Sequence, residues 1–154
     1  MIRTVDKAQR LTQLVDRMRE HGYRMTPQRM AVLQELLRTD GHPSVEEIYR
    51  KLEPAYPMMS RATVYKTVAT LKELGEVLEL EFSDDHNHYD AYTPQPHPHL
   101  ICRSCRRIED YPVVDLGELT TQVAALSGYH ALAPRLDFYG VCGDCSAAGG
   151  QRRP

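Results

Sequence analysis

The sequence lacks the features that mark membrane-spanning and secreted proteins. Its 154 residues contain no long apolar run, and no basic segment followed by an apolar one stands near Met1. We therefore expect neither a membrane span nor a signal peptide, and we expect the protein to act in the cytoplasm. In that reducing compartment, the four cysteines are better explained as metal ligands or redox groups than as structural disulfides.

An excess of charge of one sign is also lacking. The formal net charge is only -2 at pH 7, so the total charge does not indicate a nucleic-acid partner. The length allows one domain or two small ones. Function must therefore be sought in local patterns.

The first half of the chain has the pattern of several short helices. Apolar residues recur at helical spacing in residues 11–18, 32–37 and 48–52. Ser44 and Glu47 form a capping box ahead of the third segment. These signals predict three helices before residue 55.

A fourth helix and a strand follow. The segment SRATVYKTVATLKELG begins at Ser60 with an apolar face at helical spacing and ends at Gly75. Residues 76–82, EVLELEF, then alternate between polar and apolar, and SDDHNH after them is typical of a turn. Short helices followed by a strand ribbon predict a winged helix-turn-helix domain.

The fourth helix is the candidate for DNA recognition. From Met58 to Lys72 it carries cations and hydroxyl groups but no acidic residue, and such groups serve phosphates and base edges in a major groove. An ordinary amphipathic helix with a solvated polar face is the alternative. The place of this helix, after three helices and before a strand ribbon, favours DNA recognition. The candidate residues are Arg61, Thr63, Tyr65, Lys66 and Thr67.

The second half predicts a small α/β unit. Residues His99–Ile108 and Arg135–Val141 have strand character, and DLGELTTQVAALSG between them has the pattern of a helix. So small a unit leaves a sheet edge and an apolar face that a second copy could cover. The fold class is therefore α+β, with a winged helix-turn-helix domain followed by a small α/β dimerisation domain. The expected limits are 1–85 for DNA binding, 86–145 for dimerisation and metal binding, and 146–154 for a disordered tail.

Two C-x-x-C motifs predict a zinc site. Cys102 and Cys105 form the first pair, Cys142 and Cys145 the second, and together they offer four thiolates for a closed tetrahedral site. A pair of disulfides or a thioredoxin-like dithiol is the alternative, but neither needs two copies around a strand-helix-strand unit. A closed Zn(II) site has no open position, so we expect it to be structural.

The histidines just ahead of the first pair predict a second metal site. In PHPHLICRSC, His97 and His99 alternate along an expected strand, so both imidazoles point to one face. Nitrogen and oxygen donors without thiolate suit Fe(II), Mn(II) or Zn(II) better than Cu(I). Further candidate ligands are His42, His86, His88, Asp90 and Asp110.

The segments MTPQRMAVL, GHPSVEEIY, SRATVYKTV, PHPHLICRSC and RLDFYGVCGDC together resemble the ferric uptake regulator (Fur) family of bacterial metal-dependent repressors. The resemblance covers nearly the whole chain. It implies a homodimer that binds a double-stranded DNA operator, with a structural zinc on the four cysteines. It also implies a regulatory Fe(II) or Mn(II) site between the two domains, to which the DNA-binding side contributes His42 and the dimerisation side the other ligands. The ligands so implied are His42, Asp90, His97, His99 and Asp110.

Two carboxylates indicate the branch of the family. Asp90 and Asp110 stand where the iron-uptake branch typically has glutamate, which favours the peroxide-sensing (PerR-like) branch. No fifth cysteine is present, which counts against the zinc-uptake branch. An iron- or manganese-responsive uptake regulator without peroxide sensing is the alternative. The helix has VYKT where asparagines follow the tyrosine in well-known peroxide sensors, so its operator preference is expected to differ.

Two other classes of function remain open at this stage. A mononuclear metalloenzyme could use the same histidines and aspartates, but the sequence offers no evident substrate-pocket residues, so we expect a protein that is not an enzyme. A zinc-stabilised protein-interaction module is the other class. His86 and His88 are either additional ligands or solvent-facing residues of the wing.

Overall fold

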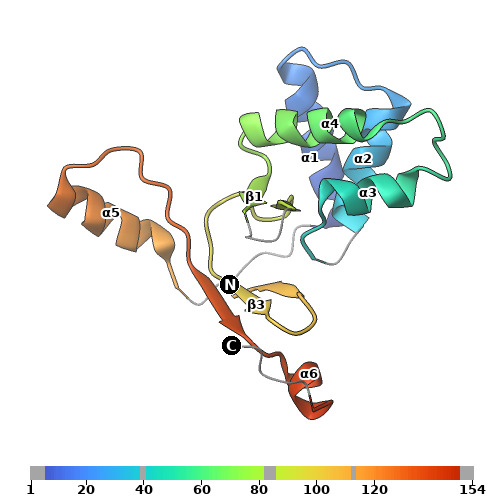
Figure 1. Ribbon diagram of the computed structural model, residues 1–154. Coiled ribbons are helices and arrows are strands. Elements are labelled where there is room, and N and C mark those ends of the chain that lie inside the picture. The colour runs from blue at the N-terminus through green and yellow to red at the C-terminus, as the bar shows by residue number, and fades with distance from the viewer. Residues whose placement is uncertain (1–5, 39–40, 82–85, 112–113, 150–154) are drawn as a thin grey trace. The chain divides into compact units, whose positions relative to one another are not determined.

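The computed structural model describes residues 6–38, 41–81, 86–111 and 114–149. These residues fall into two compact units, which divide between Pro94 and Gln95 (Figure 1). The first holds α1 (Lys7–Glu20), α2 (Pro27–Arg38), α3 (Val45–Leu52), α4 (Arg61–Glu73), β1 (Leu78–Leu80) and β2 (His88–Asp90). The second holds β3 (His99–Cys102), β4 (Ile108–Asp110), α5 (Leu116–Ser127), β5 (Asp137–Gly140) and α6 (Gly143–Ala147). Helices followed by a small sheet unit confirm the predicted α+β class.

The four helices of the first unit surround one apolar core. Leu14, Leu33 and Val64 come from α1, α2 and α4 and are fully buried in it. The expected capping box at Ser44 is present, since its side chain accepts from the Glu47 N–H while the Glu47 carboxylate takes the Ser44 N–H. The predicted helices are thus confirmed.

A buried ion pair ties α1 to the rest of the first unit. Arg10 donates from Nη1 to Glu76 Oε2 at 3.0 Å and from Nη2 to the Glu76 carbonyl at 2.8 Å. Its Nε donates to the Ala91 carbonyl at 2.7 Å, directly after β2. Arg17 holds the other oxygen of Glu76 at 2.8 Å. Arg10 therefore fixes the backbone on either side of the wing.

Strands β1 and β2 form the antiparallel wing, with Leu78 opposite Asp90. The Glu79 carboxylate on β1 accepts hydrogen bonds from Lys72 on α4, from Asn87 and from Tyr89. Burial by itself would raise the pKa of Glu79, but these hydrogen bonds outweigh it and lower the pKa below its usual value. The wing is therefore anchored to α4 by a charged group, and β2 belongs to the first unit, although the sequence limits of 1–85 and 86–145 assign it to the second domain.

The second unit is built on a three-stranded sheet in the order β4-β3-β5, with β3 antiparallel to β4 and parallel to β5. One strand was expected over His99–Ile108, and this was wrong. The chain turns after Cys102 and returns as β4, with Arg106 at a positive φ of 66° and its N–H bonded to the Cys102 carbonyl. The turn that brings two thiols together also ends the strand.

Helix α5 begins and ends with the expected signals. The Asp115 side chain accepts from the N–H groups of Gly117 and Glu118, and Gly128 closes the helix at a φ of 73°. After β5, helix α6 continues through Ala147, so the first residues of the expected 146–154 tail are helical, and residues 150–154 lie outside the described part. Among the described residues, no helix has the length and apolar character that crossing a bilayer requires.

The two arginines on Glu76 allow a matched prediction. Arg10→Met should lower the free energy of unfolding by about 3 kcal/mol, because it leaves a largely buried carboxylate with one partner fewer and two carbonyls without their donor. Arg17→Met should change it little, because the Arg17 side chain is 42% exposed. Urea unfolding of both variants checks this, and equal losses would contradict the assignment of Arg10 as the buried anchor.

Candidate metal centres

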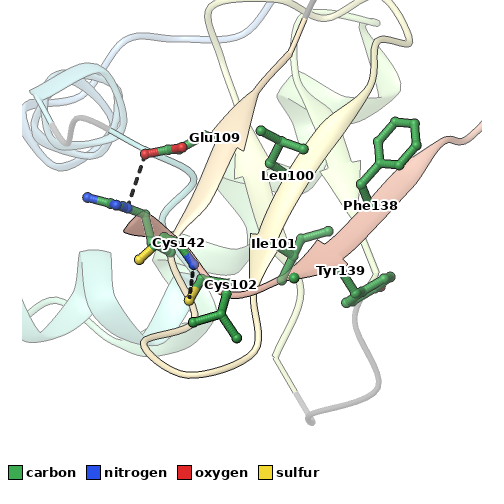
Figure 2. Close-up of a pocket in the computed structure, with 10 residues that line it drawn as sticks. Leu100, Ile101, Cys102, Glu109, Phe138, Tyr139 and Cys142 are labelled. Atoms are coloured by element: carbon green, nitrogen blue, oxygen red, sulfur yellow. Dashed lines mark hydrogen bonds and ion pairs between the residues drawn. The ribbon is translucent and has the colours of Figure 1, made fainter. Parts of the chain in front are cut away.

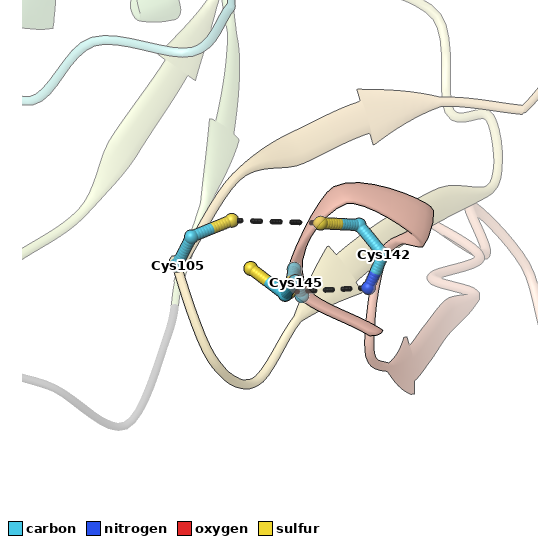
Figure 3. A group of neighbouring side chains, drawn as sticks. Cys105, Cys142 and Cys145 are labelled. Carbon is cyan, nitrogen blue, oxygen red and sulfur yellow. Dashed lines mark hydrogen bonds between the residues drawn. The ribbon is translucent and has the colours of Figure 1, made fainter. Parts of the chain in front are cut away.

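Four cysteines converge at one end of the second unit. Cys102 ends β3, Cys105 lies in the turn after it, and Cys142 and Cys145 lie at the start of α6 and within it. Their four sulfur atoms lie within 4.8 Å of one another. Figure 3 shows Cys105, Cys142 and Cys145 of this cluster. All four are free thiols, and the Cys105 and Cys142 sulfurs are 3.8 Å apart, well beyond a disulfide bond. The predicted four-cysteine cluster is therefore formed.

The four thiols of the cluster form a donor set that a cation would stabilise. The Cys142 backbone N–H donates to Cys102 Sγ at 3.3 Å and is the main cause that lowers the pKa of Cys102 to about 6. A hydrogen bond with Ser104 favours the Cys145 thiolate, but interactions with Cys142 and Cys105 outweigh it and raise the pKa of Cys145 to about 12. The Cys102 thiolate is stabilised by backbone N–H donors, whereas Cys145 keeps its proton in hydrogen bonds with neighbouring cysteines. Zn(II) fits this donor set, since it binds four thiolates in tetrahedral geometry and offsets their charge.

A second group of donors lies on the same sheet of the second unit. His99 on β3 is directly opposite Asp110 on β4, and its Nε2 lies 3.8 Å from Asp110 Oδ1. His97 Nε2 lies 3.1 Å from the same oxygen. Both imidazoles are buried, while the Asp110 side chain is 31% exposed. Two imidazoles and a carboxylate that converge in this way suit a divalent ion such as Fe(II), Mn(II) or Zn(II).

The other ring nitrogens of these histidines face oxygen atoms. His97 Nδ1 lies 2.8 Å from the Gln95 carbonyl, and His99 Nδ1 lies 3.4 Å from Asp137 Oδ1. Asp137 was not among the residues singled out in the sequence. Its position opposite His99 depends on the register between β3 and β5, which a single sequence does not fix.

The first unit carries a further histidine and carboxylate pair. His42 Nε2 lies 3.8 Å from Asp90 Oδ2, and both side chains are almost fully buried. Asp90 Oδ1 accepts the N–H groups of Tyr92 and Thr93 at 2.7 and 3.1 Å. These bonds fix the carboxylate, and the structure places Asp90 on β2, in the same compact unit as His42.

The two additional histidines lie near the wing. His88 is on β2 with its Nδ1 2.6 Å from the His42 carbonyl, and His86 is exposed. Neither belongs to a group of possible metal ligands among the described residues. His88 instead supports the backbone at His42.

The candidate DNA-binding residues differ in how they lie on α4. Tyr65 and Lys66 are exposed, and Thr63 is half-buried. Arg61 is exposed too, with its Nε 3.0 Å from Glu46 and its guanidinium 5.2 Å from the centre of the Tyr49 ring. Thr67 is buried, and its hydroxyl donates to the Thr63 carbonyl at 2.8 Å. Of the five candidates, Arg61, Tyr65 and Lys66 are therefore the ones whose side chains are exposed.

Comparison with known proteins gives one consistent result. A family model described as "Ferric uptake regulator family" matches residues 20–139. The chain is 37% identical over 139 residues to the "Peroxide operon regulator" of Bacillus subtilis (strain 168), covering 90% of this chain and 95% of that protein. Among solved structures it is similar to PerR from Streptococcus pyogenes, described for peroxide sensing and gene regulation, at 32% identity with a TM-score of 0.50, covering 88% and 92% of the two chains. It is also similar to a zinc-bound manganese uptake regulator, at 29% identity with a TM-score of 0.63, covering 84% and 98%.

The cysteine cluster predicts the effect of losing one ligand. Cys142→Ser should expel tightly held zinc and lower the melting temperature, because folding and metal binding are coupled in such sites. Zinc content by elemental analysis and thermal unfolding check this. Ser146→Ala is the control, because Ser146 is exposed and next to Cys145 in the chain, and its replacement removes no thiol. An unchanged zinc content and melting temperature in Cys142→Ser would contradict the assignment.

Proposed function

Because the chain belongs to the ferric uptake regulator family, we propose that it is a metal-dependent DNA-binding transcriptional repressor that senses peroxide through Fe(II), with Mn(II) as the alternative regulatory metal. The observation that carries the proposal is the convergence of the buried imidazoles of His97 and His99 with the carboxylate of Asp110, since these donor atoms suit such ions. The name of the Bacillus subtilis relative supports a regulator and not an enzyme. We place its action in the cytoplasm, where operator DNA is found.

The proposed regulatory site draws on both compact units. His97, His99 and Asp110 come from the second unit, and His42 and Asp90 from the first. Each unit by itself offers an incomplete set of donors. Metal affinity is then highest for the arrangement of units that brings both sets to one ion, and metal binding selects that arrangement.

Metal binding is thereby linked to DNA binding. If the arrangement selected by the metal also places two recognition helices for successive major grooves, metal strengthens operator binding, and loss of metal releases the operator. The linkage is reciprocal, so operator DNA should also strengthen metal binding.

Besides DNA, the proposed partner is a second copy of the chain, which would cover an apolar face of the second unit. Helix α5 and strand β5 leave several large apolar side chains exposed, among them Leu126, Phe138 and Tyr139. Leu100 on β3 is directly opposite Phe138, and both line a hollow of about 180 Å³ on the sheet (Figure 2). An exposed apolar face of this kind is typical of a subunit interface. A homodimer places two copies of α4 on one DNA duplex.

Fe(II) at the regulatory site would donate the electron that reduces hydrogen peroxide. The oxidant produced would then lie beside the imidazoles that hold the ion. His42 and His97 are the positions at which the family resemblance places oxidation. An oxidised imidazole binds metal more weakly, so the site loses its ion and the repressor leaves the operator. The alternative function is an iron- or manganese-responsive uptake regulator, which would keep its histidines unmodified through the same exposure.

The exposed side chains of α4 predict an effect on operator binding. Tyr65→Ala and Lys66→Ala should each weaken binding of the operator duplex while both metals stay bound. For Lys66→Ala, the slope of the logarithm of the binding constant against the logarithm of the salt concentration should become less steep by about one, because one phosphate contact is lost. Arg19→Ala, an exposed cation on α1, is the control. Titrations at several salt concentrations check this, and wild-type affinity in both α4 variants would exclude α4 as the recognition helix.

The carboxylate on β4 separates the two candidate functions. Asp110→Glu keeps the charge and the oxygen donor but adds a methylene, so metal-dependent DNA binding should persist while most of the peroxide sensitivity is lost. Iron-loaded and manganese-loaded wild type are exposed to peroxide, then assayed for operator binding and for oxygen added to His42 or His97 by peptide mass analysis. The manganese-loaded protein should stay unmodified. If the iron-loaded wild type also keeps its DNA and its histidines, the uptake regulator is the better account.

A further inference from the structure

We propose that Asp137 is a positioning residue for the regulatory metal, whose carboxylate holds the Nδ1 side of His99 so that Nε2 is directed to the ion. The inference rests on the proposed regulatory site and assigns a role within it to a residue that is not itself a ligand. It follows from the register of the sheet, the chemistry of the imidazole ring and the charge next to Asp137.

The sheet places Asp137 and Asp110 on opposite sides of His99. His99 on β3 is the register partner of Asp110 on β4 and also of Asp137 on β5. Register partners on neighbouring strands point to the same face of a sheet, so the three side chains form one row with the imidazole at its centre. His99 Nε2 faces Asp110 at 3.8 Å and Nδ1 faces Asp137 at 3.4 Å. The His99 and Asp137 side chains are only 2% and 8% exposed.

The imidazole of His99 can serve the metal only in one tautomer. A neutral ring has one N–H and one lone pair, and the lone pair must be on the nitrogen that faces the ion. An ionised carboxylate only accepts hydrogen bonds, so Asp137 favours the N–H on Nδ1 and leaves the lone pair on Nε2. The Gln95 carbonyl, 2.8 Å from Nδ1, favours the same tautomer in His97. Both rings are thus prepared to bind through Nε2, on the side of Asp110.

Arg135 holds the carboxylate of Asp137 in the orientation that this role needs. Its Nε lies 2.6 Å from Asp137 Oδ2, on the oxygen that does not face His99. A buried carboxylate is costly without such a partner. Because the guanidinium holds Oδ2, the other oxygen, Oδ1, is the one on the side of the ring, 3.4 Å from His99 Nδ1. Acceptors behind metal-binding histidines act in this way, by fixing both the tautomer and the orientation of the ring.

A structural ion pair between Arg135 and Asp137 is the competing explanation, and two variants separate the two roles. In Asp137→Asn, Arg135 must donate to the amide oxygen, which turns the amide NH₂ towards His99 Nδ1. The NH₂ group donates, so the lone pair of His99 moves to Nδ1 and Nε2 carries the proton. Asp137→Ala removes the acceptor but imposes no tautomer. A positioning role therefore predicts that Asn, the closer match in shape, damages metal binding more than Ala, whereas Ala costs more stability.

The probe is Mn(II), added to zinc-loaded protein that holds no other metal, with free Mn(II) measured by electron paramagnetic resonance. Asp137→Asn should weaken Mn(II) binding by about 10- to 100-fold, and Asp137→Ala should weaken it less. Glu109→Gln is the matched control, because Glu109 is a neighbouring carboxylate paired with Arg107 Nε at 3.0 Å but 51% exposed. It should bind Mn(II) like the wild type. Nitrogen-15 shifts of the His99 ring should report the proton on Nδ1 in the wild type and on Nε2 in Asp137→Asn.

The outcomes are distinguishable. If the wild type binds Mn(II) and Asp137→Asn binds it within about twofold, or if affinity follows melting temperature through both variants, Asp137 is only structural and the inference is wrong. If Asp110→Ala binds Mn(II) as tightly as the wild type does, the regulatory site itself is misassigned, and this inference is wrong with it. A loss in Asp137→Asn that exceeds the loss in Asp137→Ala, together with the changed tautomer, supports the positioning role.

Discussion

The hydrogen-bonded register of β3 is the constraint on which both metal centres depend. This strand of four residues carries His99 at its first position and Cys102 at its last. Side chains alternate along a strand, so His99 and Cys102 point to opposite faces as well as lying at opposite ends. A slip of one residue against β4 or β5 would turn His99 away from Asp110 and Cys102 away from its partners. One strand therefore keeps two metal sites apart while it positions a ligand in each.

The charges of the two centres explain why one is suited to permanence and the other to exchange. Four thiolates surround an ion completely and leave it no open position. Backbone N–H donors lower the pKa of Cys102, and hydrogen bonds with neighbouring cysteines, which outweigh the one with Ser104, raise the pKa of Cys145. The regulatory donors are imidazoles and carboxylates, which bind hard divalent ions with lower affinity and lose them more readily. A sensor needs this difference, because its fold must persist while its regulatory metal leaves.

Much of the structure could be predicted from the sequence, and what could not was long-range. Helix limits follow from local signals, such as the capping box at Ser44 and the glycine after α5, and the cysteine cluster follows from the doubled motif. The break of the strand after Cys102 was missed, because strand periodicity outweighed the tight turn that the C-x-x-C motif requires. The burial of Thr67 depends on how α4 packs against α2 and α3. Asp137 depends on a parallel pairing that only the tertiary structure contains.

Positioning groups behind the ligands determine what the ligands can do. Asp90 is held by two backbone N–H groups, and the backbone just after it is held by Arg10, which also fixes the turn after α4 at Glu76. A displacement of Asp90 is therefore resisted by the same arginine that anchors the turn after α4. The proposed metal ligand Asp90 and the end of the proposed recognition helix are thus held through one buried side chain within the first unit, so that a change at either is resisted by contacts to the other.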